Sequence, residues 1–208
     1  NENEQKLINK QNQYNNDKNE KMNWNPFYKN MANYISKNDV LIKCDDDILF
    51  IDIFSLKNAI QYRIKDTESF IIHSNCINNG VCTYYQRNKF DKIKHLLDIY
   101  PKGGILGPIF EKPEIAYAIH NQFLDDLLSN IYHLNKYIIE DVYIDTRISI
   151  NFILMRGSDV KYLKDVGTND EYELSGFFPQ KLFRPNKIKG DLITSHLSYK
   201  IQDKIRLK

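Results

Sequence analysis

Apolar and polar positions alternate in blocks along the chain, and the spacing within each block predicts its secondary structure. Ala116, Ile119, Phe123, Leu127 and Ile131 recur three and four positions apart, which is typical of one helix face. Short, nearly continuous runs of Ile, Phe and Val are typical of buried strands. The expected helices span 26–36, 54–65 and 113–135. The expected strands span 40–43, 48–53, 69–73, 81–85, 147–155 and 187–197.

The alternation of these strands and helices predicts an α/β layer fold. The dipeptide Asn79-Gly80 is typical of a tight turn, here leading into a returning strand. Residues 89–112 carry several Pro and Gly and are expected to form loops, and 156–159 are expected to turn into a short helix. Residues 1–24 are rich in Asn, Lys and Glu, which indicates a polar arm or loose helix before one domain over 25–208.

The net charge and the hydropathy of the chain argue against nucleic acid and membranes as binding partners. The chain has 208 residues, 42% of them hydrophobic, which is enough apolar material for a core. Its 29 basic and 27 acidic side chains give a net charge of +2, so no strong field favours nucleic acid or an anionic membrane. No apolar run approaches the ~20 residues of a transmembrane helix, and no signal peptide is visible.

The cysteines indicate a reducing environment. Cys44, Cys76 and Cys82 are an odd and sparse set, which argues against a disulfide scaffold and favours the cytoplasm. The absence of a CxxC pair argues against a structural zinc site. The chain begins with Asn rather than Met, which indicates a fragment or a processed product and leaves an upstream membrane anchor open.

Three adjacent carboxylates, Asp45, Asp46 and Asp47, stand between two apolar segments expected to be strands. Burying such charges without partners is costly, and a bound divalent cation at the end of a strand offsets that cost. In an extended backbone Asp45 and Asp47 project to the same side and Asp46 to the other. The alternative is a polar β-turn that joins the two flanking strands as a hairpin.

The segment KCDDDILFID, residues 43–52, resembles the DXD element of GT-A glycosyltransferases. Other segments resemble further elements of such enzymes from fungi, bacteria and large DNA viruses, in the same order, so that the resemblance spans about residues 24–203. These segments are 25–28, 74–81, 147–151, 170–175 and 190–196. The resemblance implies a GT-A-like mixed sheet flanked by helices. Such domains place several strands before DXD, whereas only 44 residues precede Asp45, so the N-terminal strands are expected to be missing or abbreviated.

The resemblance also implies a ligand set. Asp45, Asp47 and His196 would hold Mn²⁺ or Mg²⁺, and Asp45 and Asp46 would also position the donor. The donor would be a nucleotide-sugar, with a UDP-sugar favoured. Taken alone, His196 is better explained as a capped or surface histidine, and only the DXD context makes the ligand interpretation comparable.

Basic residues near the site are candidates for the donor's diphosphate. We assign Lys43 and Arg184 to donor binding, because basic side chains commonly contact phosphoryl oxygens. Solvated surface positions are the alternative reading for the basic residues that precede the last strand.

The acidic pair Asp170-Glu171 resembles the element near the acceptor site of the same enzymes. It implies that Asp170, with Glu171 in reserve, takes a proton from the acceptor hydroxyl of a glycan or glycoprotein in an inverting reaction. The same two acids are also typical of a helix start, where they would interact with the helix dipole. Two other functions stay open, namely a Mg²⁺-dependent nucleotidyl or phosphoryl transferase and a non-catalytic cation- or carbohydrate-binding module.

Overall fold

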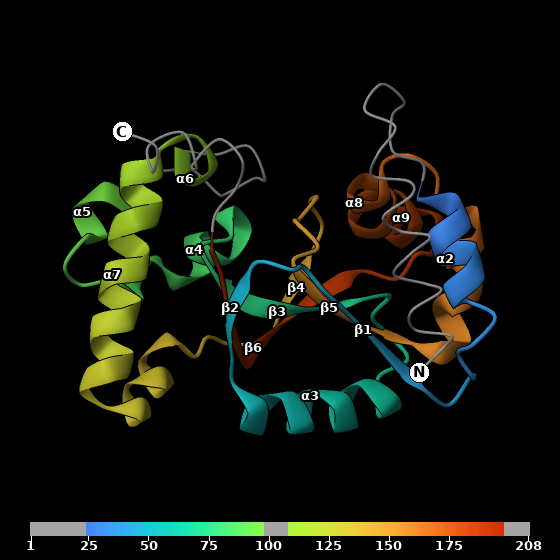
Figure 1. Cartoon of the computed structure of the whole chain (residues 1–208), viewed down its shortest axis with the longest axis horizontal. Helices are drawn as coiled ribbons and strands as arrows, with labels where there is room; N and C mark the ends of the chain where they lie inside the picture. Colours follow the sequence, from blue (N-terminus) through green and yellow to red (C-terminus); the bar gives the residue numbers. More distant parts are fainter. Residues whose placement is uncertain (1–23, 98–107, 198–208) are drawn as a thin grey trace.

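The computed structural model describes residues 24–97 and 108–197, so the expected arm and part of the loops at 89–112 lie outside the described residues. Within them, helices flank a mixed six-stranded sheet, which confirms the α/β class (Figure 1). The strands are β1 Val40–Cys44, β2 Ile48–Ile51, β3 Ile72–Ile77, β4 Val142–Ile144, β5 Phe152–Arg156 and β6 Asn186–His196. The path runs β1-β5-β3-β6-β2, and β4 also pairs with β6.

The longest strand, β6, organises the sheet. It runs parallel to β3 along one edge, and all the other strand pairs in the sheet are antiparallel. Its other edge is shared between two strands: Ile188 pairs with Val142 of β4, and Thr194 pairs with Ile51 of β2. Nine of the eleven residues of β6 are buried, and the last five of them form an unbroken buried run that ends at His196.

Helices pack around the sheet on three sides (Figure 1). They are α2 Asn25–Met31, α3 Ile53–Lys65, α4 Gly80–Gln86, η1 Arg87–Lys89, α5 Lys94–Leu97, α6 Pro108–Glu111, α7 Pro113–Ser129, η2 Ile131–Tyr137, η3 Gly157–Asp165, α8 Asp170–Tyr172, the π-helical η4 Glu173–Phe177 and α9 Phe178–Leu182. Helix α3 covers one face through Ala59, which packs with Ile72 and Leu154 of the sheet. Helix α7 packs Phe123 against Ile193, and the α2, η3 and α9 group surrounds Phe70.

One predicted strand is wrong. Residues 81–85 belong to helix α4, and Asn79 is its N-cap rather than part of a hairpin turn. The Asn79 Oδ1 atom accepts hydrogen bonds from the backbone N–H groups of Val81 and Cys82, both at 3.1 Å. Asparagine is among the preferred N-cap residues because its side-chain oxygen satisfies N–H groups that lack a partner within the helix.

Several other boundaries differ from the expected ones. The third strand begins at Ile72 rather than residue 69, and the expected strand over 147–155 begins only at Phe152. The helix expected over 26–36 ends at Met31. The long helix ends at Ser129 because Asn130 leaves the helical conformation and caps a 3₁₀ segment by accepting the Tyr132 N–H at 2.9 Å.

Candidate metal centre

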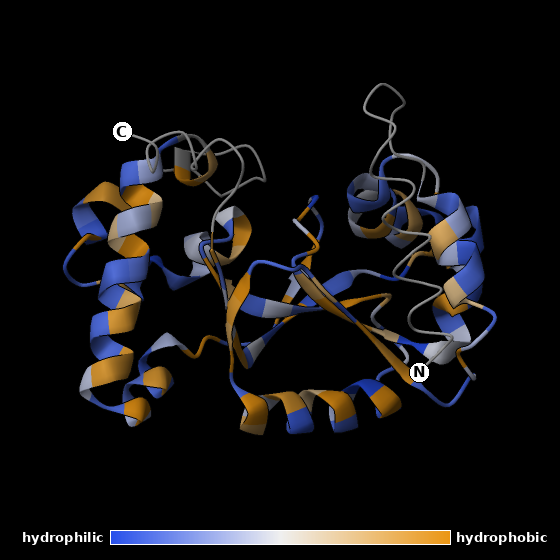
Figure 2. Cartoon of the chain, in the orientation of Figure 1, coloured by the Kyte–Doolittle hydropathy of each residue, from blue (hydrophilic) through white to orange (hydrophobic). Residues whose placement is uncertain are grey.

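The acidic triplet is not a hairpin turn. Strands β1 and β2, which flank it, lie at opposite ends of the strand path and pair with β5 and β6 respectively. The triplet therefore crosses from one side of the sheet to the other, as a polar link between two apolar strands (Figure 2). Its ends are tied down, because the Asp45 N–H donates to the Asn151 carbonyl and the Leu197 N–H donates to the Asp47 carbonyl, both at 2.9 Å.

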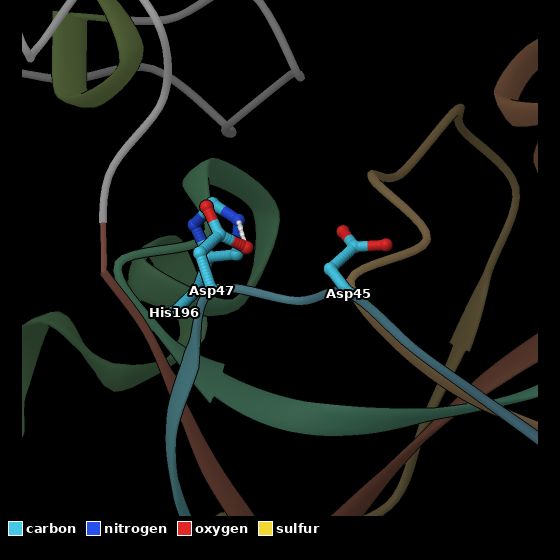
Figure 3. Close-up of side chains that lie close together, drawn as sticks. All are labelled: Asp45, Asp47 and His196. Carbon is cyan, nitrogen blue, oxygen red and sulfur yellow. Dashed lines mark ion pairs between the residues drawn. The ribbon is translucent and has the colours of Figure 1, made fainter. Parts of the chain in front are cut away.

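This crossing brings Asp45 and Asp47 to the end of β6, next to His196 (Figure 3). Each of the three residues offers a ligand atom, and these atoms all lie within 4.8 Å of one another. His196 is only 3% exposed, whereas the two aspartates are partly buried. Asp46 is exposed and lies outside this cluster. The expected extended backbone is not found here, because Asp46 and Asp47 form a turn in which the Ile48 N–H donates to the Asp45 carbonyl at 3.4 Å.

Asp47 and His196 form the tightest pair of the centre. Their Oδ1 and Nε2 atoms are 3.0 Å apart (Figure 3). Burial lowers the pKa of His196, although the charge of Asp47 opposes this change. Burial also raises the pKa of Asp47, and His196 opposes that change. The pocket thus favours a neutral imidazole, which is the form of histidine that binds metals.

Asp45 is held by neighbours from two other segments. The Lys43 ammonium contacts Asp45 Oδ1 and also donates to the Ile150 carbonyl at 2.9 Å. On the other oxygen, Asn151 Nδ2 donates to Asp45 Oδ2 at 3.2 Å. Asn151 in turn accepts a hydrogen bond from Asn79 Nδ2 at 2.9 Å. Sequence reasoning missed Asn79 and Asn151 as site residues; the one signal that they carry is an amide side chain beside apolar residues.

The acidic pair 170–171 opens helix α8, as expected, with Asn169 as the N-cap. The Tyr28 hydroxyl donates to Asp170 Oδ2 at 2.9 Å. Burial and the Asp170 carboxylate raise the pKa of Tyr28 far above its usual range, and the charge of Asp45 adds to this rise. The pKa of Tyr28 therefore depends on the charges of both Asp170 and Asp45. Glu171 forms an ion pair with Arg147 at 2.7 Å.

Arg184 is placed away from the centre. Its guanidinium binds both carboxylate oxygens of Asp159, at 2.8 and 2.9 Å, and the Ser69 carbonyl at 2.6 Å. It precedes the first residue of β6, whereas His196 is the last, and a strand of that length spans roughly 30 Å. The assignment of Arg184 to donor binding stays a prediction, and in the structure its charge is paired with Asp159.

Two carboxylates and an imidazole are a ligand set suited to a divalent cation. Carboxylate oxygens suit Mg²⁺ and Mn²⁺, and an imidazole shifts the preference toward Mn²⁺ or a later transition metal. The three ligands come from two segments about 150 residues apart in sequence, and the residues that flank them are fixed by backbone hydrogen bonds. The residues present thus fit a cation of this class.

Comparisons with protein-family models, with curated proteins and with solved structures found no match to this chain. The GT-A-like arrangement therefore stays a prediction, whereas the mixed sheet flanked by helices is observed in the structure. Over residues 24–97 and 108–197, each helix is too short or too polar to cross a membrane.

Proposed function

We propose that the protein is a metal-dependent glycosyltransferase that moves a sugar from a nucleotide-sugar, favourably a UDP-sugar, to a hydroxyl of a glycan or glycoprotein. The observation that carries this proposal is the convergence of Asp45, Asp47 and His196 at one end of the sheet. The two aspartates belong to the segment that resembles the DXD element, and the histidine ends the strand that resembles the late metal-binding strand.

In this scheme Asp45, Asp47 and His196 hold Mn²⁺ or Mg²⁺. When bound, the cation neutralises charge on the donor's diphosphate and acts as a Lewis acid. Asp46 is exposed beside these ligands and is available to the ribose hydroxyls of the donor. The Lys43 ammonium lies against Asp45 and adds positive charge where a diphosphate would lie.

Asp170 is the proposed base for the acceptor hydroxyl. Its Oδ2 atom accepts from Tyr28, and its Oδ1 atom accepts from the Glu171 N–H at 2.9 Å. These two hydrogen bonds orient the carboxylate, and a general base must be held within reach of the hydroxyl from which it takes a proton. Besides burial, the charges of Asp170 and Asp45 both raise the pKa of Tyr28, and Asp170 makes the larger contribution of the two.

The test is a donor screen with the full chain that measures release of nucleoside diphosphate. We expect turnover with one class of nucleotide-sugar, loss in EDTA and recovery with Mn²⁺. Replacement of residues that only support a metal ligand costs about 10- to 100-fold, so Asp47→Asn should lower activity by more than about 100-fold. Asp125→Asn, an exposed substitution on α7, is the matched control and should leave turnover unchanged.

Other products would identify another function. Release of pyrophosphate would indicate a nucleotidyl transferase. Binding of Mn²⁺ without any effect of nucleotide would indicate a non-catalytic module. Full activity of Asp47→Asn at a low concentration of divalent cation would contradict the proposed metal-dependent mechanism.

A further inference from the structure

The two carboxylate oxygens of Asp45 are held by donors of different charge. Oδ1 contacts the Lys43 ammonium, and Oδ2 accepts a hydrogen bond from the neutral Asn151 amide at 3.2 Å. A neutral donor orients a carboxylate without opposing a cation. An ammonium also orients it, but repels a divalent ion that approaches the same group.

The orientation of the Asn151 amide follows from the fold. Backbone N–H groups of Val81 and Cys82 point at one atom of the Asn79 side chain, which must therefore be its oxygen. The other end of Asn79, Nδ2, then donates to Asn151 Oδ1 at 2.9 Å. Asn151 is thus left with its own Nδ2 toward Asp45. The backbone N–H groups at the start of helix α4 therefore determine which end of each amide donates, from Asn79 to Asn151 and from Asn151 to Asp45.

This chain of amides fills the place where two strands separate. The pairing of β3 with β5 ends at His73 and Ile153, and beyond it Asn79 and Asn151 bridge the two segments. Asn79 is 2% exposed and Asn151 is 4% exposed, so bulk water has little access to replace these contacts. A buried, directionally fixed donor is what a preorganised ligand needs.

We propose that Asn151, oriented by Asn79, is a positioning residue that holds Asp45 ready for the cation, and that Lys43 is a resident positive charge that lowers cation affinity. This inference rests on the proposed function in one respect, the presence of a cation at Asp45, Asp47 and His196. It adds that two neighbours of the same carboxylate act on metal affinity in opposite directions.

The test measures the affinity of the full chain for Mn²⁺ alone by isothermal titration calorimetry, with electron paramagnetic resonance of free Mn²⁺ as a second readout. Asn151→Ala should weaken binding by about 10- to 100-fold, the usual effect of losing a residue that supports a metal ligand. Lys43→Met should tighten binding on the order of tenfold, because it removes a charge next to Asp45. The exposed substitutions Asn135→Ala and Lys57→Met are the matched controls, and both should leave the affinity for Mn²⁺ unchanged.

Asn79→Asp separates orientation from charge. The new carboxylate can still cap helix α4, but when ionised it cannot donate to Asn151. Added negative charge alone would tighten Mn²⁺ binding, whereas loss of amide orientation weakens it. We expect weakening by about tenfold. The unfolding midpoint without metal, measured for each variant, shows that the change in affinity does not come from loss of the fold.

The outcomes are separable. Weaker binding for Asn151→Ala and Asn79→Asp, together with tighter binding for Lys43→Met, supports the proposal. If the unmodified protein binds Mn²⁺ but Asn79→Asp binds it more tightly, or Lys43→Met binds it no better, the proposal is overturned and the metal centre stands. If the unmodified protein binds neither Mn²⁺ nor, in a parallel titration, Mg²⁺, the proposed function fails and this inference fails with it. Lys43 is partly exposed, so its variant carries the test even if a buried asparagine variant does not fold.

Discussion

At the scale of single residues, Tyr28 links the acidic pair to the body of the protein. It is 3% exposed, and its hydroxyl donates to Asp170 Oδ2 at 2.9 Å. A hydrogen bond to a charged group contributes about 1.5–3 kcal/mol, so Tyr28→Phe should lower the unfolding free energy by about that amount in urea titrations. Tyr132→Phe, at a 76% exposed position, should change it by less than about 0.5 kcal/mol.

A double-mutant cycle isolates this contact. Tyr28→Phe and Asp170→Asn, measured singly and together, should show a coupling energy of at least about 0.5 kcal/mol. Strictly additive effects would mean that the hydroxyl and the carboxylate do not interact in solution.

Gly190 gives a prediction about close backbone approach. A Cβ atom at this position would lie 2.0 Å from the Ile139 carbonyl oxygen, which is backbone and has little freedom to move. The Gly190 carbonyl also accepts from Asn75 Nδ2 at 2.9 Å, which holds the strand in place. Gly190→Ala should therefore cost about 3 kcal/mol or more in unfolding free energy.

The matched control is Gly176→Ala. Its Cβ would meet only the Tyr172 ring, at an ordinary contact distance of 3.5 Å. We expect a neutral or slightly stabilising effect by thermal unfolding, because alanine is favoured over glycine in helices. Equal unfolding midpoints for the two variants would show that the backbones around Gly190 are less constrained than the structure indicates.

The site residues differ in how far the sequence could predict them. Asp45 and Asp47 could be predicted, because adjacent carboxylates beside apolar strands are chemically unusual. His196 was assigned only through the resemblance to a late metal-binding strand. Asn79 and Asn151 could not, because the role of a neutral amide depends on which partner lies across the sheet. Arg184 was assigned to the donor from its type alone, and its partner Asp159, which is 25 residues away in sequence, could not be predicted.

At the scale of elements, local sequence patterns predict the secondary structure of most segments, but they do not predict which segments pair or pack with one another. The run 79–85 has the composition of a turn and a strand, yet the same Asn also suits a helix N-cap. The packing of α4 against β3 and the fixed donors at its start decide between the two. In the same way, nothing local distinguishes a hairpin turn at 45–47 from a crossing between two distant strands.

A buried ion-pair network joins α3, η3 and the segment before β6, and it gives the prediction at this scale. Arg63 is 0% exposed and contacts Asp66 at 3.1 Å and Asp159 at 3.5 Å. Burial lowers the pKa of Arg63 to about 10, and the two carboxylates oppose that change. Arg63→Met leaves buried carboxylates with fewer partners and should lower the unfolding free energy by about 3–5 kcal/mol.

The comparison is an exposed ion pair. Lys92 and Asp125 are 3.0 Å apart, but their side chains are 62% and 65% exposed. Lys92→Met should therefore cost no more than about 1 kcal/mol by denaturant unfolding. A cost for Arg63→Met as small as this would show that the buried network contributes packing rather than charge pairing.

At the scale of the whole molecule, the sheet order could not be read from the sequence. Alternating strands and helices predict the α/β class, whereas the order β1-β5-β3-β6-β2 depends on long-range pairing. That order has a chemical consequence: because β1 and β2 lie on opposite sides, their connection must cross the end of β6. The crossing is what brings the acidic link to His196.

The global stability of this sheet should depend on pH through His73 at its centre. The side chain is 2% exposed, and burial lowers the pKa of its imidazole to about 3, against an ordinary value of about 6.5 in the unfolded chain. Between these two pH values the unfolded state binds a proton that the folded state does not. The unfolding free energy therefore falls as pH falls through this window, by about 1.4 kcal/mol per pH unit.

From pH 7 to pH 5 this residue alone should remove about 2 kcal/mol, measured by urea unfolding at each pH. His73→Gln is neutral throughout, so its unfolding free energy should fall by about 2 kcal/mol less over the same range, whatever its value at pH 7. Other titrating groups contribute equally to both proteins and cancel in the comparison. His95→Gln, at an exposed position, should follow the unmodified protein. Parallel curves for His73→Gln and the unmodified protein would mean that the imidazole gains a proton in the folded state, and that the centre of the sheet admits water.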